Sequence, residues 1–421
     1  TDSGSGITAG KPVIVTSDGK AEQIAEASIA TSISQDGIVV VSGATNYWGN
    51  IAYGNGHVVA VYIDTNSDLC SVSGIVNTNG TVTWTSHRVQ YAGTTTLPTV
   101  CYVEDHDRWV ISFRNSGVSN RLFAIACTMD SSTGRLNAYY SLTATTAVTV
   151  PQDMDACSNG DMAILCLRHA NRQKTQVVKI NPSTFVISMG SLQDWSAVIG
   201  YNGSIRYNKT LDRVCLYYKR SNNAYFRLLT PPPSYASTSG STDWLGSATG
   251  ELVASSLTVS HSGPLSFDID TSGRLIAYFT DSNNRTQIIL ADVTASAISF
   301  RQIYQYSTAD YDYGEIVYDP AIDKFLWVFK DYTSSTNMPM RGLTIAPPAS
   351  GNFTSSSINE LASTPNNVEN FASGHGVYAP ELNGMVYITF NNSQPTGGGN
   401  QVEYLVYRSA QSVTNLTAEN F

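Results

Sequence analysis

Hydrophobic and polar positions alternate along this chain in short runs. Each run is rich in Val, Ile, Tyr and Phe, and Gly, Asn, Asp or Ser residues separate it from the next. This pattern is typical of β-strands joined by tight turns. A helical stripe is visible only in the short segment 21–30. The pattern therefore predicts an all-β protein.

One phrase recurs along the chain. A Gly or Pro is followed two residues later by an apolar residue and four residues later by an aromatic residue, as in segment 49–53. The copies start near residues 49, 98, 151, 203, 263, 314 and 374. A second apolar run follows each copy, and these runs end at Tyr62, Phe113, Leu167, Tyr218, Phe279, Phe329 and Phe390. The copy at Pro151 departs from the phrase, because Asp153 and Asp155 replace its apolar and aromatic residues. Seven copies at steps of roughly 50 to 60 residues indicate an internal repeat.

Each repeat continues with a polar turn, a third apolar run and, in most copies, a more polar fourth run. Such a unit reads as a four-stranded antiparallel meander. Seven of these units predict a seven-bladed β-propeller, because packing blades radially buries both faces of each sheet. The first two strands are the most apolar, so we expect them to lie nearest the axis.

The two ends of the repeat region predict how the ring closes. The seventh repeat lacks a good fourth strand, whereas a strand-like run at 37–43 precedes the first repeat. We therefore expect Ile38 to Ser42 to supply the outer strand of blade seven. This gives a propeller over 37–421 and an N-terminal attachment segment over 1–36, with a hairpin around the turn "SDGK". An insertion at 231–251 follows a third strand, so we expect it on the face opposite the inter-blade loops.

Composition excludes several classes of protein. The net charge is −9 and no basic run is present, which argues against a nucleic-acid partner. No apolar stretch reaches the length that crosses a membrane, so no membrane insertion is expected. The cysteines form no CxxC pair, and Cys101, Cys127, Cys166 and Cys215 lie in apolar runs. We expect these four to be buried free thiols.

The sequence contains no recognisable catalytic or metal motif. No two histidines have metal-ligand spacing, and neither GxSxG nor a phosphate-binding loop occurs. Asp268 and Asp270 resemble the start of a calcium loop, but its twelfth position is Phe279, so we expect a hairpin turn there. Asp310 and Asp312 precede a first strand and are the remaining calcium candidates. No other metal and no cofactor is expected.

An enzyme is not expected from the sequence. Sialidase propellers carry an Asp box, an arginine cluster and a paired Tyr and Glu, whereas segments 132–140 and 271–279 lack the Trp of that box. Acid–base chemistry on a sugar also needs carboxylates brought close together, and a single sequence does not show that. We therefore predict no catalytic residues.

The loops between blades carry aromatic residues among Asn, Ser, Thr and Asp. In a propeller these loops gather on one face near the axis. Aromatic rings stack on the apolar faces of sugars, and short polar groups bind hydroxyls. The predicted ligand-binding residues are Tyr47, Trp48, Tyr91, Trp195, Tyr201, His261, Tyr311, Tyr313, Phe371 and His375. The alternative is that these aromatic side chains fill the gaps between blades.

The repeats resemble a known group of proteins. Repeats of the form "GEIVYDPAIDKFLWVFKDYTSS" at 314–335, with turns rich in Ser, Thr and Asn, resemble propeller repeats in structural proteins of tailed phages, especially marine ones. The opening at 6–20 and the ending at 415–421 also resemble segments that flank such regions. The resemblance implies a virion protein: a tail fibre or receptor-binding propeller that contacts a glycan or protein of the host cell surface, beside other virion proteins. A homo-oligomer is compatible with this role.

Two alternatives to a fibre remain open. One is a purely structural virion component, such as a tail nozzle or a capsid decoration. The other is a propeller glycosidase or lyase. Two carboxylates held close together beside arginines would favour the enzyme.

Overall fold

The chain is described by a computed structural model. Its description covers residues 13–15, 21–23, 27–29, 32–34, 39–42, 44–149, 151–195, 200–220, 223–231, 249–253, 265–307, 311–331, 340–363, 371–391, 401–408 and 411–413. Regular structure in these ranges consists of strands and the 3-10 turns η1 (Glu104–His106), η3 (Ser355–Ser357) and η4 (Pro380–Leu382). None of the helical turns within these ranges could cross a membrane.

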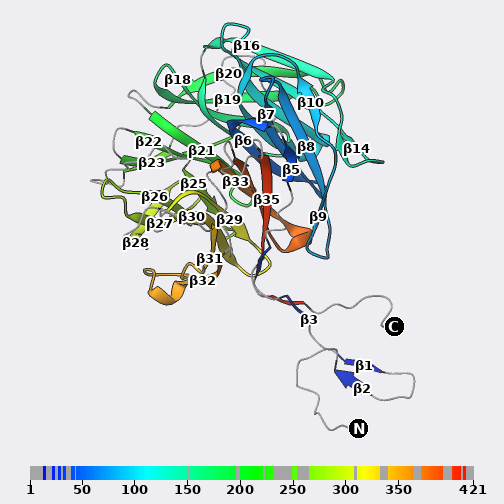
Figure 1. The fold of residues 1–421 in the computed structure, drawn as a ribbon. Helices are drawn as coiled ribbons and strands as arrows, with labels where there is room; N and C mark the ends of the chain where they lie inside the picture. Colours follow the sequence, from blue (N-terminus) through cyan, green and yellow to red (C-terminus); the bar gives the residue numbers. More distant parts are fainter. Residues whose placement is uncertain are drawn as a thin grey trace.

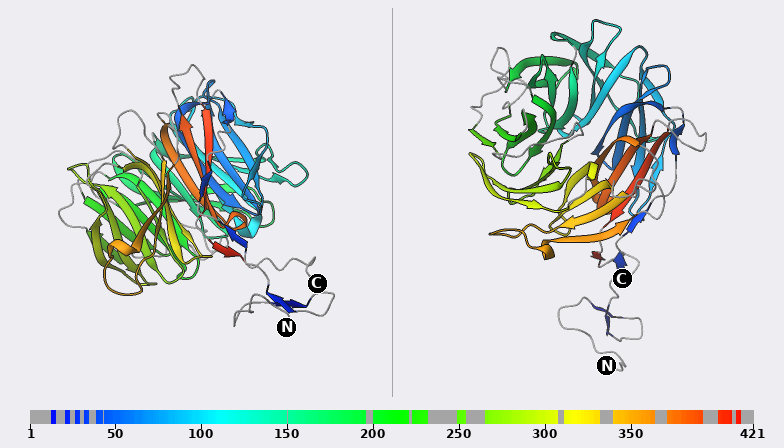
Figure 2. Two further views of the ribbon diagram at one scale, coloured as in Figure 1. Left: turned by 60° about the horizontal axis from the view of Figure 1, so that its bottom comes forward. Right: turned by 60° about the vertical axis from the view of Figure 1, so that its left-hand side comes forward.

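Seven small antiparallel sheets stand radially around one axis (Figures 1 and 2). This confirms the predicted seven-bladed propeller. From the axis outward, the strands are β6 (Ala44–Gly54), β7 (His57–Asp64), β8 (Leu69–Val76) and β10 (Arg88–Tyr91) in blade one; β11 (Thr95–Val103), β12 (Arg108–Asn115), β13 (Arg121–Cys127) and β16 (Ser141–Thr149) in blade two; β17 (Gln152–Ser158), β18 (Met162–His169), β19 (Arg172–Ile180) and β20 (Ile187–Asp194) in blade three; and β21 (Gly200–Asn208), β22 (Arg213–Arg220), β23 (Asn223–Leu229) and β24 (Thr249–Val253) in blade four.

The remaining blades follow the same order. Their strands are β25 (Ser266–Ile269), β26 (Arg274–Thr280), β27 (Thr286–Val293) and β28 (Ile298–Gln305) in blade five; β29 (Tyr311–Asp319), β30 (Lys324–Asp331), β31 (Met340–Ile345) and β32 (Ile358–Ser363) in blade six; and β33 (Phe371–Ala379), β34 (Gly384–Asn391) and β35 (Gln401–Arg408) in blade seven. Short extra strands are β9 (Val82–Trp84), which pairs with β8, and the pair β14 (Met129–Asp130) and β15 (Arg135–Leu136).

The hydrophobic core lies between the blades. One apolar cluster fills each of the seven interfaces between neighbouring blades. The second strands are buried on both faces, and Trp109 and Trp327 are the largest fully buried side chains. Strands buried on both faces read as continuous apolar runs, which explains why these runs were the clearest part of the repeat.

The glycine that opens the repeat phrase has a packing role. A Cβ added at Gly49 would lie 2.0 Å from Cζ of Phe390, in the blade across the interface. Since Phe390 is itself part of the core, it has no room to move away. The inner strand of blade one therefore approaches blade seven more closely than a larger residue would allow.

The ring closes as the sequence predicts. Strand β5 (Val39–Ser42) pairs with β35, with Val41 opposite Val402. Strand β4 (Ser32–Ser34) pairs with the other end of β35, with Ile33 opposite Tyr407. The predicted boundary at residue 36 is therefore placed too late. The short polar sequence of β4 gave no strand signal, because a segment of three residues shows no alternation.

Four more short strands lie outside the ring (Figures 1 and 2). Strands β1 (Val13–Val15) and β2 (Ala21–Gln23) form the predicted hairpin. Strand β3 (Ala27–Ile29) pairs with β36 (Gln411–Val413), so the two ends of the chain run side by side as they leave the propeller. An attachment role for this region stays a prediction. Most of the insertion at 231–251 lies outside the described residues.

Candidate functional site

Each of the seven inner strands carries a polar residue at the same structural position. In every blade this residue pairs with the fifth residue of the second strand, which makes the seven positions equivalent. The residues are Asn50, Thr99, Asp155, Ser204, Ser266, Glu315 and His375. The innermost part of the propeller is therefore polar, whereas the interfaces between its blades are apolar.

The register corrects the predicted repeat phrase in two blades. The residue before the polar position is Met154 in blade three and Leu265 in blade five, not the predicted Pro151 and Gly263. In blade three the predicted start at Pro151 lies before the irregularity between Gln152 and Asp155, whereas the predicted starts of blades two, four and six lie within the equivalent irregularity. In blade five the sequence alternates with a period of two, so a shift of two residues leaves the pattern unchanged.

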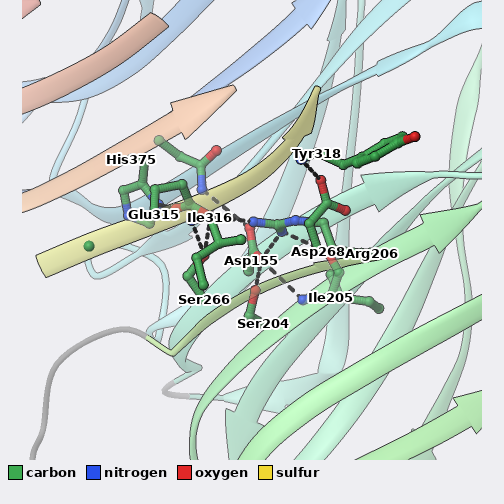
Figure 3. A network of polar contacts seen from close by, with 12 residues as sticks. Asp155, Ser204, Ile205, Arg206, Ser266, Asp268, Glu315, Ile316, Tyr318 and His375 are labelled. Carbon is green, nitrogen blue, oxygen red and sulfur yellow. Dashed lines mark hydrogen bonds and ion pairs between the residues drawn. The ribbon is translucent and has the colours of Figure 1, made fainter. Parts of the chain in front are cut away.

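Arg206 joins two carboxylates from different blades (Figure 3). It lies on β21, two residues after the polar position of blade four. Its Nη1 donates to Oδ2 of Asp155 over 2.9 Å, and its Nη2 donates to Oε1 of Glu315 over 2.6 Å. Nη1 also donates to the carbonyl oxygen of Ile205 at 2.8 Å. Both terminal nitrogens of this guanidinium are therefore engaged.

Glu315 contacts side chains from three other blades. Besides Arg206, its Oε1 accepts a 2.5 Å hydrogen bond from Oγ of Ser266 in blade five. Its Oε2 lies 3.5 Å from Nδ1 of His375 in blade seven. The Glu315 side chain is only 5% exposed, whereas Arg206 and His375 are 23% and 21% exposed. Two bonds thus fix one carboxylate oxygen and leave the other facing an accessible imidazole.

Two aspartates of the same region bind the backbone of the next blade. Oδ2 of Asp155 accepts from the backbone nitrogen of Ile205, and Oδ2 of Asp268 accepts from that of Tyr318. These inner strands are sheet edges, whose free N–H groups need acceptors when they are buried. Asp155 and Asp268 therefore join neighbouring blades. We call Asp155, Arg206, Asp268, Glu315 and His375 the axial cluster.

The electrostatic environment shifts the pKa values of these two aspartates in opposite directions. Burial raises the pKa of Asp155, but Arg206, His375 and two backbone N–H groups outweigh it and hold this pKa below its usual value. Burial raises the pKa of Asp268 above its usual value, and the attraction of Arg206 does not cancel that effect. Burial lowers the pKa of Arg206, but the negative charges of Asp155, Glu315 and Asp268 raise it by more. The net shift is upward, so this guanidinium stays charged.

The polar positions of blades one and two are uncharged. Asn50 donates from Nδ2 to Oδ1 of Asp155 over 3.4 Å. Thr99 is 0% exposed, and its Oγ1 has no hydrogen-bond partner in the part of the chain that the structure describes. Hydrogen-bonding capacity in this sector is therefore incompletely used.

The predicted ligand-binding residues separate into three groups. His375 belongs to the axial cluster. Tyr91 packs against Phe113, Trp195 donates to Thr175, and Tyr311 is buried, as the gap-filling alternative describes. The side chains of Tyr47, Trp48, Tyr201, Tyr313, Phe371 and the calcium candidate Asp312, and the whole of His261 and Asp310, lie outside the described residues.

The structure also places Asp268, Asp270 and the four cysteines. Oδ1 of Asp270 accepts from the backbone nitrogens of Ser272 and Arg274, which confirms the predicted hairpin turn. Asp268 was wrongly assigned to that turn, because it lies in β25 and faces the next blade. Within the described ranges, no group of three His, Cys, Asp or Glu side chains could hold a metal ion. The four cysteines predicted to be buried free thiols are so.

Sequence reasoning missed Glu315 and Ser266 and gave Arg206 no partners. A usable signal was nevertheless present, because a polar residue follows the glycine of the phrase in most repeats. The departure at Asp155 was noticed, and the structure places this residue in the axial cluster. Which polar residues meet depends on the ring geometry, since Arg206 and Glu315 are separated by a whole blade.

Comparisons with known proteins identify the fold only. No protein-family model and no curated protein matches the sequence. Among solved structures, an ulvan lyase, which is a polysaccharide lyase, matches with 10% identity and a TM-score of 0.56, over 89% of this chain and 97% of its own. A periplasmic gluconolactonase from Pseudomonas aeruginosa matches with 11% identity and a TM-score of 0.51, over 89% and 98%. At such identities the likeness shows a shared propeller fold.

The sequence-based prediction that the protein is not an enzyme is corrected here. Solved propellers similar to this chain include a polysaccharide lyase and a gluconolactonase, so the fold is one that carries enzymatic chemistry. The prediction also relied on the lack of grouped carboxylates and arginines. The axial cluster supplies that grouping with Asp155 and Glu315 on Arg206.

Proposed function

We propose that this propeller is a carbohydrate-active enzyme that cleaves a polysaccharide at the axial cluster. One observation carries the proposal: Glu315, Arg206 and His375 come from three blades and meet at one point (Figure 3). A fixed carboxylate beside an accessible imidazole is an arrangement suited to general acid–base catalysis. The likeness to a polysaccharide lyase and a gluconolactonase supports it as an analogy of fold.

The contacts assign a role to each residue. Arg206 and Ser266 hold Oε1 of Glu315, so its Oε2 is the oxygen that takes a proton. His375 donates the other proton to the substrate, because its Nδ1 lies beside that oxygen while part of its ring is accessible. Cleavage of a glycosidic bond requires one proton to be removed and another to be given. This pair supplies both transfers.

An activity screen tests the proposal. Wild-type protein is incubated with neutral, amino-sugar and uronate polysaccharides, and new reducing ends are measured. We expect at least one polymer to be cleaved, and E315Q to lose roughly 100-fold or more of the rate. The Gln oxygen can still accept from Arg206 and Ser266, so this variant keeps those bonds while losing the base.

The control variant is H106Q. His106 is also paired with a carboxylate, since its Nε2 lies 2.9 Å from Oδ1 of Asp161, but this pair lies outside the axial cluster. We expect H106Q to keep wild-type activity and H375Q to lose it. A wild-type protein that cleaves no polymer, or an E315Q variant with full activity, contradicts the proposal.

The predicted place of the protein in a phage virion is a separate proposal. It rests on the form of the repeats, such as the one at 314–335. The two proposals are compatible, because a fibre that contacts a host glycan can also cleave it. Mass spectrometry of purified virions tests the virion proposal, and absence of this chain from the particles of its phage would refute it.

A further inference from the structure

We infer that the axial cluster hydrolyses a polymer of neutral or amino sugars, and that it does not eliminate across a uronate. The inference rests on the proposed function and specifies its substrate class and reaction. Three observations carry it: the ion pairs of Arg206 with two carboxylates, the excess of carboxylates in the axial cluster, and the uncharged residues at the equivalent positions of blades one and two.

The first observation concerns the cation that a uronate would need. Elimination removes a proton next to the substrate carboxylate, and the charge that develops there has to be neutralised by a cation. Arg206 is the guanidinium of the axial cluster, and its Nη1 and Nη2 are bonded to Asp155 and Glu315. A uronate bound to Arg206 would therefore compete with two buried carboxylates for one cation.

The second observation concerns charge. Asp155, Asp268 and Glu315 face one arginine, so the cluster has more carboxylates than cations even when His375 is protonated. These groups are largely buried, where like charges repel more strongly than in water. A further carboxylate or sulfate is therefore disfavoured, whereas a hydroxyl or an ammonium group is accepted.

The third observation concerns the equivalent positions in blades one and two. Asn50 and Thr99 place an amide and a hydroxyl at the same structural position as Asp155 and Glu315, and both residues are buried. At this position, blades one and two therefore supply no cation that could bind the carboxylate of a uronate.

Glu315 and His375 can carry out the two proton transfers that hydrolysis of a glycosidic bond requires. Glu315 takes a proton from a water molecule, whose oxygen bonds to the anomeric carbon. The bond from that carbon to the leaving sugar breaks, and the leaving oxygen takes a proton from the imidazolium of His375. Glu315 then releases its proton to solvent water and the imidazole of His375 takes one from solvent water, which restores both groups. Water is the only co-reactant.

The experiment compares one polymer in two charge states. A polyuronate and its carboxyl-reduced form are offered beside a neutral glucan and chitosan, in water enriched in oxygen-18. Cleavage is followed by reducing ends, by label at the new ends, and by the ultraviolet absorbance of an unsaturated uronate. We expect the carboxyl-reduced form to be cleaved at least about 10-fold faster than its parent, with one labelled oxygen per cut.

The outcomes separate the inference from the proposed function. An unsaturated product from the polyuronate, lost in E315Q, overturns the inference and leaves the proposed function standing. A wild-type protein that cleaves none of the polymers overturns both. D268N removes one negative charge, so we expect the ratio of acidic to neutral cleavage to rise several-fold. That ratio does not depend on the folded fraction of the variant, and an unchanged ratio contradicts the charge argument.

Discussion

Oε1 of Glu315 accepts a 2.6 Å hydrogen bond from Nη2 of Arg206, which joins blade six to blade four across the propeller axis. Blade five lies between them in the sequence and in the ring. An ion pair that skips a blade is possible only near the axis, where inner strands of different blades converge. The pair therefore lies near the propeller axis, where the proposed chemistry takes place.

Removing the shared cation should destabilise the protein. Arg206→Ala leaves Asp155 and Glu315 largely buried without their counter-charge, so we expect a loss of about 3 kcal/mol in the free energy of unfolding. Denaturation by urea measures it. The matched control is Lys209→Ala, because Lys209 pairs with Glu104 at the surface and should contribute less than about 1 kcal/mol. Equal losses of unfolding free energy in the two variants would show that the ion pairs of Arg206 stabilise the fold no more than a surface pair does.

The contribution of Asp155 should depend on pH. Its pKa in the folded protein lies below the usual value, so its stabilisation is complete above about pH 4, the usual value for an unfolded Asp, and is lost as the pH falls through the folded pKa. The stability of D155N should therefore lie furthest below that of wild type at neutral pH and approach it in acid. A difference in stability between D155N and wild type that stays constant from neutral to acidic pH would contradict the assignment of Arg206 as the partner of Asp155.

Two glycines with positive φ should respond differently to alanine. A Cβ at Gly273 would lie 2.1 Å from the backbone oxygen of Val293, whereas a Cβ at Gly351 meets nothing within 4 Å. Both positions carry a left-handed backbone, so G351A should cost about 1 kcal/mol for that conformation alone. G273A should cost roughly 3 kcal/mol or more, because its clash is with backbone. Similar melting temperatures for the two variants would rule out this packing.

Truncation from the N-terminus tests the closure of the ring. Deleting residues 1–30 removes β1 to β3 but keeps β4 and β5 on β35, so we expect only a small fall in melting temperature. Deleting residues 1–43 exposes the edge of β35 and opens blade seven, so the fall should be large. Circular dichroism on heating measures both. If the longer deletion melts like the shorter one, the N-terminal strands do not close the propeller.

The fold was predictable from the sequence because its signal is repeated. Seven apolar runs in the second strands, such as the one ending at Phe329, are buried on both faces and mark one blade each. The closing strand at Val39–Ser42 was predictable as well, because a strand without a place in the first repeat had to complete the last one. The strand at Ser32–Ser34 was not predictable, because its pairing is fixed by β35 and not by its own residues.

The candidate site was predictable only in part. Asp155 and His375 were singled out from the sequence, one as a departure from the repeat and the other as a loop residue. The partnership of Arg206 with Glu315 was not visible, because 109 residues separate the two. Sequence places each residue on its own strand, whereas the meeting point follows from the curvature of the whole ring. Local pattern carries no information on that curvature.

A crystal structure of E315Q soaked with an oligosaccharide that the wild type cleaves would show whether the axial cluster is the catalytic centre. We expect a sugar ring against His375 and residue 315, with the bond to be cleaved next to both. A sugar bound at the outer rim, with the axial cluster unchanged and empty of sugar, would contradict it.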